Sequence, residues 1–420
     1  MTPIGVHVRE TFESLRSRNF RLFFVGQLVS VTGTWMQQVA AAWLVLRLTG
    51  NGVALGIDTG LTFLPLLLFG LRGGELADRA DRRRILLTTN ALLGVLALAL
   101  WAIVDTGVVR LWMVYALSFL SGSVTALDNP ARQSFYAEMV EEEHLTNAVS
   151  LNSAVMTGSR IIGPALAAAV VAGFGLAWCF LINAVSYLAA IGALAAMRPH
   201  ELRRTPSRER GKVRETLAYV RSDPALWFPI ALMAALYTLS FNFSVTMPLL
   251  AERTFGGTVA TYGTLLSFYG LGSFLGALGM ARVRNPNPRR LAWAAIAFGV
   301  AQGGLALAPT LDAAHALVVV FGIVSMAFMI TGNTGLQLAA RPDMRGRVMA
   351  IYAIIFLGGT PIGAPLTGAL AEHLGPREAV AFGAIAAVVA GVVALRALAA
   401  RSARDATAGP TAPLAPTSAD

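Results

Sequence analysis

Twelve apolar stretches, each about long enough to cross a lipid bilayer, fill most of the sequence. A hydrocarbon layer of about 30 Å needs about 20 residues of α-helix. On that scale we predict spans at 20–47, 52–72, 85–105, 110–132, 148–171, 175–197, 225–251, 258–281, 290–309, 313–338, 347–371 and 378–400. The sequence therefore predicts an all-α polytopic membrane protein with twelve transmembrane helices.

Composition agrees with a chain whose main solvent is lipid. Of the 420 residues, 13% are charged and 55% are hydrophobic, whereas about 25% of a soluble domain is charged. The net charge of +10 would suit a nucleic-acid partner, but the basic residues are scattered along the chain. The one cysteine, Cys179, lies in an apolar run, which excludes an intramolecular disulfide and a thiolate metal cluster. We expect the lipid bilayer as a partner, and no nucleic acid, metal or cofactor.

The positions of the basic residues predict the orientation. With the N-terminus inside, the inner loops and ends hold 28 lysines and arginines, whereas the outer loops hold 4, at Arg47, Arg110, Arg253 and Arg377. Short cationic loops stay on the cytoplasmic side of a membrane. We therefore expect both termini in the cytoplasm. Lys212 is the only lysine beside many arginines, which indicates a GC-rich bacterial genome, so we expect a multi-pass protein of the bacterial cytoplasmic (inner) membrane.

A long polar interruption separates six spans from the next six. We expect an N-terminal six-helix bundle over 1–197, a cytoplasmic linker over 198–224, a C-terminal six-helix bundle over 225–400 and a disordered tail over 401–420. Within the linker, Val213, Leu217 and Val220 recur at helical spacing among basic residues, which predicts a short amphipathic helix on the inner leaflet. A solvated run of charges is the alternative interpretation.

The two halves resemble each other at an offset of 200 residues. Spans 5 and 11 share a set of small and apolar residues at the same spacing, namely Gly163, Leu166, Ala169 and Gly175 in one and Gly363, Leu366, Ala369 and Gly375 in the other. Internal repeats are typical of transporters built from two related bundles. We expect two pseudo-symmetric six-helix bundles with a cavity between them.

The loop after span 2, GGELADRADRRR (73–84), resembles the signature loop of the major facilitator superfamily, although Asp81 stands where a glycine is usual. Further matching segments are SRNFRLFFVGQLVSVTGTWM (17–36), LVLRLTGNGVALG (44–56), FLPLLL (63–68), ALDNPARQSF (126–135) and RGRVMAIY (345–352). Together they resemble the drug and siderophore exporter branch called transmembrane secretion effectors, which includes the enterobactin exporter and macrolide efflux permeases. The resemblance implies the major facilitator fold.

The resemblance also implies a gate at the inner side. In the signature loop, Gly74, Asp78 and Arg79 occupy the family's positions, and Asp78 is expected to meet the positive N-terminus of span 11 and hold the inner gate shut. In related exporters, an arginine four residues after this aspartate pairs with an acid at the inner end of span 4, which here implies Arg82 with Asp128. The alternative is that the arginines of this loop only anchor the inner side.

Two ionisable residues, Asp58 in span 2 and Arg160 in span 5, lie well inside predicted spans. An intramembrane charge costs at least about 2.5 to 3.5 kcal/mol unless it is paired or wetted, which makes each a functional candidate. The helical rise places both about 10 to 12 Å below the outer face. We hypothesise that they face a shared cavity and that Asp58 carries a proton whose binding releases Arg160. The alternatives are a permanent ion pair and Arg47 as the partner of Asp58.

The resemblance to the superfamily also directs attention to residues in spans 4, 5 and 11. Ser118 stands in span 4 where many superfamily antiporters have an arginine, which is a departure from that pattern. In span 5, Gly163 and Pro164 resemble the kinked segment of antiporters, and Gly363 and Pro365 lie in the corresponding part of span 11. We therefore expect helix kinks at both places.

Polar and aromatic residues of the spans that line the cavity in this superfamily are candidates for the substrate site. They are Gln37, Gln38, Asn152, Tyr237, Asn242, Tyr269, Asn333 and Gln337. Each could instead form a hydrogen bond between helices. As a set they predict an amphipathic, partly aromatic site.

These features favour a transporter over an enzyme. Four of the five histidines lie in loops or termini and the fifth, His315, lies at the start of the span 313–338, so no catalytic base or metal ligand set is placed at membrane depth. The resemblance implies proton-coupled efflux of a small amphipathic compound, such as a drug, macrolide or siderophore, by alternating access in a monomer. A lipid or lysophospholipid transporter, or a non-transporting membrane sensor, on the same fold is the alternative.

Overall fold

The computed structural model describes residues 13–203, 213–281 and 287–407, without the side chains of Leu71, Asp78, Val213, Arg214 and 402–407. Throughout these residues the regular secondary structure is helical, as the sequence predicted. Among them, ten segments are long and apolar enough to cross a membrane. The helices over the other two predicted spans, 20–47 and 290–309, form without reaching that apolarity.

The helices of the first half lie close to their predicted places. They are α2 (Arg18–Thr49), α3 (Gly52–Arg79), α4 (Arg82–Asp105), α5 (Leu111–Met139), α6 (Leu145–Phe174) and α7 (Leu176–Ala195), with short turns η1 (Glu13–Arg16), η2 (Glu142–His144) and η3 (Pro199–Glu201). Polar side chains fix several starts, because they accept hydrogen bonds from the first free N–H groups. Asn51 caps α3 in this way, and Asp81 caps α4.

The second half follows the same order with two interruptions. Its helices are α8 (Val213–Ser222), α9 (Pro224–Leu239), α10 (Phe243–Leu249), the π-helical turn η4 (Leu250–Thr254), α11 (Val259–Met280), α12 (Pro288–Ala306), α13 (Leu311–Ala339), α14 (Arg345–Gly358), α15 (Thr360–His373) and α16 (Pro376–Thr407). The prediction of a disordered tail from 401 is wrong for its first residues, because α16 continues to Thr407. The rest of the tail, 408–420, lies outside the described residues.

The spans predicted at 225–251 and 347–371 are each divided in two. Between α9 and α10 the helical hydrogen bonds are interrupted, and the carbonyl oxygen of Ser240 accepts a hydrogen bond of 3.2 Å from Gln302 Nε2 instead. Irregular backbone at membrane depth needs such a partner, because lipid supplies none. The second break falls at Gly359, which packs against the backbone of Tyr237.

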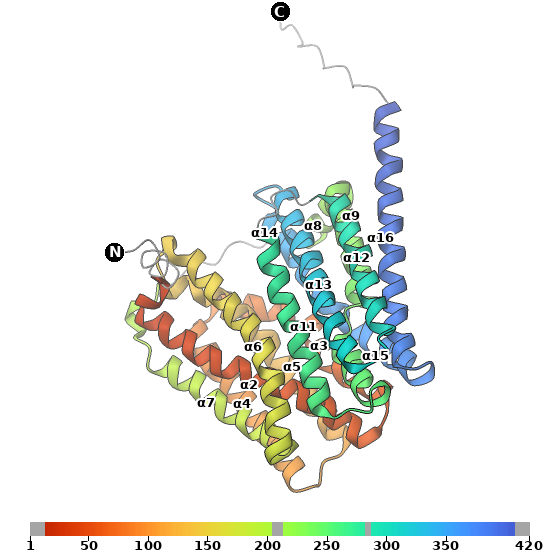
Figure 1. The fold of residues 1–420 in the computed structure, drawn as a ribbon. Helices are drawn as coiled ribbons and strands as arrows, with labels where there is room; N and C mark the ends of the chain where they lie inside the picture. Colours follow the sequence, from red (N-terminus) through yellow and green to blue (C-terminus); the bar gives the residue numbers. More distant parts are fainter. Residues whose placement is uncertain (1–12, 204–212, 282–286, 408–420) are drawn as a thin grey trace, which may run out of the picture.

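The packing of the helices repeats between the two halves, as a duplicated sequence requires. In the first half, α3 packs on α5 and α4 packs on α7. In the second half, the corresponding pairs are α11 on α13 and α12 on α16. The structure therefore consists of two related six-helix bundles, which are seen side by side in Figure 1.

Glycines at equivalent positions support the repeat. Gly175 and Gly375 end α6 and α15 with positive φ angles of 96° and 116°, a conformation that L residues rarely adopt. At Gly163 an added Cβ would lie 2.5 Å from the Cβ of Trp35 on α2, and at Gly363 it would overlap the carbonyl oxygen of Thr238 on α9. Each glycine thus lets span 5 or span 11 approach the first helix of its own bundle.

The bundles meet along two seams. In the first, α3 packs on α15, and in the second, α6 packs on α11. The contacts lie toward the ends of the bundles remote from the start of α2 and the end of α16, which we call the far side; the opposite side is the terminal side. Figure 1 shows the ribbons converging toward the far side and diverging toward the terminal side.

The linker is attached to both bundles. Near its start, Arg203 donates a hydrogen bond of 2.8 Å to Glu141, at the end of the first bundle's α5. Its helix α8 packs on α9 and α14 rather than lying apart from the bundles, and Val220 is buried whereas Leu217 is exposed. The Tyr219 hydroxyl accepts a hydrogen bond of 3.1 Å from the N–H of Arg341. The predicted helix therefore forms, but its buried face is directed at the second bundle.

The α3–α15 seam depends on the absence of side chains at Gly56, where an added Cβ would overlap the carbonyl oxygen of Ala364. We expect Gly56→Leu to reduce transport in vesicles at least about tenfold, because the far side can no longer close. Gly70→Leu in the same helix is the matched control, since nothing lies within 4 Å of a Cβ built there. Equal effects of the two substitutions would contradict a role for close packing at this seam.

Candidate transport site

Asp58 lies in α3 and its side chain contacts α5. The residue is 6% exposed, and its Oδ1 accepts a hydrogen bond of 2.7 Å from Ser118 Oγ. One turn away, the Tyr115 hydroxyl donates a hydrogen bond of 3.0 Å to the carbonyl oxygen of Ala54. A hydroxyl group, at the position where many superfamily antiporters carry an arginine, is therefore the immediate partner of the buried acid.

The predicted contact between Asp58 and Arg160 is wrong. Within the described part of the chain, Asp58 forms no ion pair with Arg160 or with Arg47. Asp58 is held between α3 and α5, whereas the guanidinium of Arg160 lies over the ring of Trp35 on α2, 4.9 Å from its centroid. Similar depth in the membrane, which is all that helical rise provides, does not determine the direction of a side chain.

The structure describes the residues of the signature loop, 73–84, except for the side chain of Asp78. Gly74 is buried, and Arg79 forms an exposed ion pair of 2.5 Å with Glu75, one turn earlier in α3. The side chain of Asp78 lies outside the described residues, so the latch at the start of span 11 stays a prediction.

The implied pairing of Arg82 with Asp128 is also wrong. Arg82, at the first position of α4, forms a buried ion pair with Glu138, and Asp128 forms an ion pair with Arg132. Asp128 lies ten residues before Glu138 in α5, which corresponds to about 15 Å along the helix. At that depth, the neighbour of Asp128 from α4 is Thr89, which donates a hydrogen bond of 2.6 Å to it.

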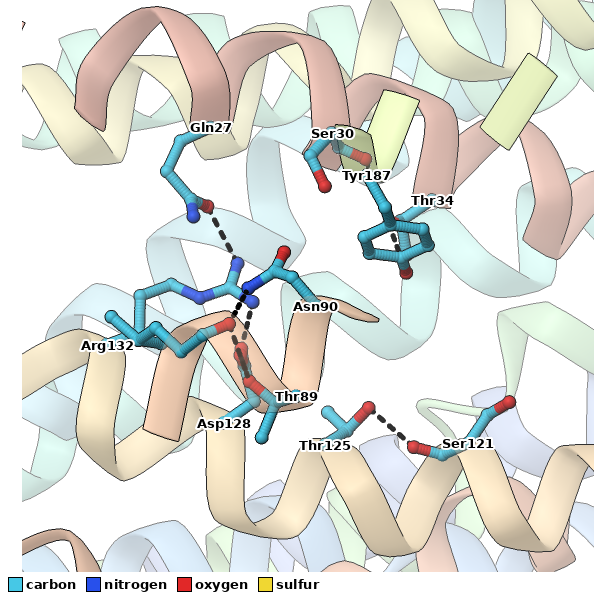
Figure 2. Close-up of polar contacts among 11 residues, drawn as sticks. Gln27, Ser30, Thr34, Thr89, Asn90, Ser121, Thr125, Asp128, Arg132 and Tyr187 are labelled. Carbon is cyan, nitrogen blue, oxygen red and sulfur yellow. Dashed lines mark hydrogen bonds and ion pairs between the residues drawn. The ribbon is translucent and has the colours of Figure 1, made fainter. Parts of the chain in front are cut away.

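Asp128 and Arg132 belong to a polar network inside the first bundle, shown in Figure 2. Arg132 also donates a hydrogen bond of 2.8 Å to Gln27 Oε1 on α2, so the network joins α2, α4 and α5. Asp128 is fully buried, and the Arg132 side chain is 15% exposed. The ion pair itself lies within α5, and its hydrogen bonds with Thr89 and Gln27 connect α5 to α4 and α2.

Removing one charge of this pair should destabilise the protein. We expect Asp128→Asn to lower the free energy of unfolding by about 3–5 kcal/mol, because Arg132 is left as a buried charge without its acid. Thermal and denaturant unfolding in detergent measure the change. Glu141→Gln, which removes an exposed pair with Arg203, is the control and should have little effect. Equal stability of Asp128→Asn and the wild type would contradict this role.

The predicted helix-kink residues contribute close packing. Pro164 and Pro365 both lie inside continuous helices, α6 and α15. The break in span 11 falls at Gly359, four residues before Gly363, and Gly363 itself provides the close approach to α9. The interruption of span 11 therefore lies one helical turn before Gly363, where the kink was predicted.

The cavity candidates fall into two environments. The half-buried or exposed ones are Gln37, Gln38, Asn152, Asn333 and Gln337, and the buried ones are Tyr237, Asn242 and Tyr269. Gln37 accepts a hydrogen bond of 2.7 Å from Asn183 on α7, and Gln337 donates one of 2.6 Å to Asn333. Gln37, Asn333 and Gln337 therefore form hydrogen bonds within their own bundles.

The buried tyrosines belong to an aromatic cluster in the second bundle. The ring of Tyr237 packs edge-on against Phe356, with centroids 4.9 Å apart, and Phe243 lies 4.9 Å from Tyr269. Phe241 stacks on Phe298 at 4.7 Å beside the break between α9 and α10. Aromatic pairs at these distances stabilise a packed core, so this cluster makes the broken helix rigid.

An ion pair that the sequence did not predict lies in the second bundle at the far side, and both of its residues form hydrogen bonds with the first bundle. Arg253 of η4 donates a hydrogen bond of 2.7 Å to Glu372 of α15, and a second hydrogen bond to the carbonyl oxygen of Gly50. Glu372 also accepts a hydrogen bond of 2.6 Å from the N–H of Gly52 at the N-terminus of α3, where a negative charge is favoured. We call these contacts the far-side clamp.

Loss of the far-side clamp should favour conformations that are open on the far side. We expect Glu372→Gln to shift the conformational equilibrium about 5- to 30-fold, corresponding to about 1–2 kcal/mol for a partly exposed cluster at a helix N-terminus. A faster reaction of maleimide with Ser267→Cys on α11, at the other seam, reports this shift.

Arg377→Gln is the matched control for the clamp, because Arg377 lies on the same side and donates to the carbonyl oxygens of Ala306 and Ala308 within one bundle. An unchanged maleimide rate in Glu372→Gln, or an equal increase in the control, would show that the clamp does not hold the bundles together.

One group of possible metal ligands occurs among the described residues. The ligand atoms of Glu141, Glu143 and His144 lie within 4.8 Å of one another beside the end of α5. Both glutamates are exposed. Exposed acidic groups commonly gather without an ion, and we assign no metal to them.

Two six-helix bundles joined at symmetric seams define a transporter of the major facilitator superfamily. Solved structures with this fold include a bacterial homologue of the human lysosomal transporter Spinster in an inward-facing, unoccupied conformation, with a TM-score of 0.69, 18% identity and coverage of 95% of this chain and 99% of that one. A POT family transporter in complex with 5-aminolevulinic acid gives a TM-score of 0.73 at 10% identity, covering 90% and 96%.

The chain belongs to the transmembrane secretion effector family, whose model matches residues 9–416. It is 25% identical to macrolide efflux protein A of Streptococcus pyogenes, over 85% of this chain and 90% of that protein. It is 24% identical to the staphyloferrin A transporter of Staphylococcus aureus, covering 84% and 90%. The multidrug efflux pump Tap of Mycobacterium tuberculosis is 27% identical, covering 84% and 87%. The family is one of transporters, which agrees with the prediction that the chain is not an enzyme.

Proposed function

We propose that this transporter exports small amphipathic compounds from the cytoplasm in exchange for protons, by alternating access. In this proposal the terminal side faces the cytoplasm, as the excess of basic residues on that side suggests. Because the seams and the far-side clamp join the bundles away from the cytoplasm, the structure corresponds to the inward-facing state. Opening of the far side then exposes the site to the exterior.

The position of Asp58 beside a seam is the observation that carries the proton-coupled part. Gly56 and Gly60, on either side of Asp58 in α3, both pack on the segment of α15 around Pro365. The acid is buried and hydrogen-bonded to α5, so it lies between a helix of its own bundle and the surface that must separate. An ionisable group at this depth is costly unless it has a function.

A change in protonation alters which hydrogen bonds this carboxyl group can make. The ionised carboxylate only accepts, as it does from Ser118, whereas the protonated acid also has a donor. A proton that binds to Asp58 when the far side is open would therefore change the packing of α3 next to the α3–α15 seam. Release toward the cytoplasm after the seam closes completes the exchange.

The relatives support export and a broad class of substrates. Their names describe macrolide efflux, staphyloferrin A transport and multidrug efflux. Macrolide efflux and multidrug efflux, which two of these names describe, are the reason that we place the substrates among small amphipathic compounds. We infer the same class of small amphipathic substrates here, without a particular compound.

Replacement of Asp58 tests the proton-coupled part of the proposal. In inverted membrane vesicles, we expect Asp58→Asn to abolish the accumulation of amphipathic dyes that a pH gradient drives, because asparagine cannot exchange a proton. Dye accumulation with and without the gradient, at equal expression, is the measurement. The vesicle panel should include dyes, macrolides, siderophores and a lysophospholipid.

Asp105→Asn is the matched control, because Asp105 is exposed at the end of α4. Ser118→Ala should leave some coupled transport, since the acid remains while its hydrogen-bond donor is lost. Full gradient-driven transport by Asp58→Asn would remove Asp58 from the mechanism. Gradient-independent flux by the wild type would contradict proton exchange altogether.

A further inference from the structure

Arg160 is a cation in the middle of a membrane-spanning helix. It lies fifteen residues after the start of the 30-residue helix α6, so either end of the helix is about 21 to 23 Å away. It is half-buried, and its Nε atom is buried with no hydrogen-bond partner among the described residues. Its guanidinium lies over the ring of Trp35, 4.9 Å from the centroid, and Tyr269 of α11 is near enough to interact with its charge.

The other buried arginines of the first bundle are treated differently. Arg82 is paired with Glu138, and Arg132 is paired with Asp128. Arg160 has no acid beside it in the described part of the chain, although the guanidinium group keeps its charge at every ordinary pH. Stacking on an aromatic ring offsets only part of the cost of a cation at this depth. Among the described residues, no acid therefore balances the charge of Arg160, and an anionic group is the chemical partner that suits it.

Arg160 lies where the two bundles meet. Its neighbour Ile161 accepts a hydrogen bond of 2.9 Å from Ser267 of α11, and the Arg160 backbone packs at Gly270 of the same helix. Trp35 comes from α2, so the side chain stands between a helix of its own bundle and the α6–α11 seam. Movement of one bundle relative to the other would change access to this cation.

We propose that Arg160, supported by Trp35, is the subsite for a carboxylate group on the transported compound. A guanidinium group that stacks by its face keeps its edge N–H groups for a bidentate contact with a carboxylate. The compound is then an amphipathic acid whose apolar part lies along Trp35. This inference rests on the proposed transport function and narrows its substrate class from amphipathic compounds in general to those with a free carboxylate.

The test compares two probes that differ only in this group. One is an amphipathic rhodamine dye with a free carboxyl group, and the other is the methyl ester of the same dye. Binding to the purified full-length protein is measured by fluorescence anisotropy, and uptake is measured in inverted vesicles. We expect the wild type to bind the acid at least about tenfold more tightly than the ester.

Variants of Arg160 separate charge from structure. Arg160→Gln should remove the preference for the acid, and Arg160→Lys should keep part of it, because lysine has the charge without the planar pair of donors. Trp35→Phe should weaken the binding of both dyes. Arg110→Gln, which removes an exposed arginine at the start of α5, is the matched control and should keep the wild-type preference.

Each other outcome contradicts a separate statement. Equal binding of the two dyes by the wild type would overturn the carboxylate subsite, and so would an undiminished preference for the acid in Arg160→Gln. If the ester is still exported in either case, the proposed transport function remains intact. Gradient-independent uptake of both dyes would overturn the proposed function instead. The wild type could also lose its preference for the acid dye when anionic phosphatidylglycerol replaces phosphatidylcholine around the protein. That result would identify a lipid phosphate as the group bound by Arg160 and would also overturn the carboxylate subsite.

Discussion

The close approach of helices at the two seams is the constraint on which the rest of the structure depends. Lipid provides no hydrophobic force that would press one bundle on the other, so contact relies on dense packing of small residues. At the α3–α15 seam, a methyl group on Gly56 would overlap the carbonyl oxygen of Ala364. A methyl group on Gly368 would likewise overlap the carbonyl oxygen of Gly52. Backbones this near can separate along one surface without breaking the packing inside either bundle.

Charge inside the first bundle is divided between stability and function. The pairs Arg82–Glu138 and Arg132–Asp128 are complete, and Thr89 and Gln27 add hydrogen bonds to the second pair. Such networks hold α2, α4 and α5 in one rigid unit. Rigidity is useful here, because a bundle that deformed would absorb the movement that a transporter has to transmit from one seam to the other.

Hydropathy predicted the helices and their order, because it depends on residues close together in sequence, and the internal repeat at an offset of 200 residues predicted the two bundles. The repeat even located Gly175 and Gly375, which end equivalent helices with positive φ. Contacts between helices were harder to predict. The pairing of Arg82 with Asp128 failed because α5 extends to Met139, beyond the predicted end at 132, so that Glu138 lies at its inner end instead of Asp128. The clamp of Arg253 and Glu372 involves residues 119 apart, in η4 and α15, whose meeting depends on tertiary packing. The break between α9 and α10 likewise depends on Gln302 from another helix.

The separation of Asp58 and Arg160 determines what kind of coupling the proposed exchange needs. Asp58 lies beside the α3–α15 seam and Arg160 beside the α6–α11 seam, and these seams are counterparts in the internal repeat. A ligand couples to a conformational change only through a difference in its affinity for the two states. Because both seams join the same two rigid bundles, they open and close together, and a proton at one seam changes access to a substrate at the other. Direct transfer of charge between Asp58 and Arg160 is then unnecessary. The relative movement of the bundles couples the binding of the proton to the binding of the substrate.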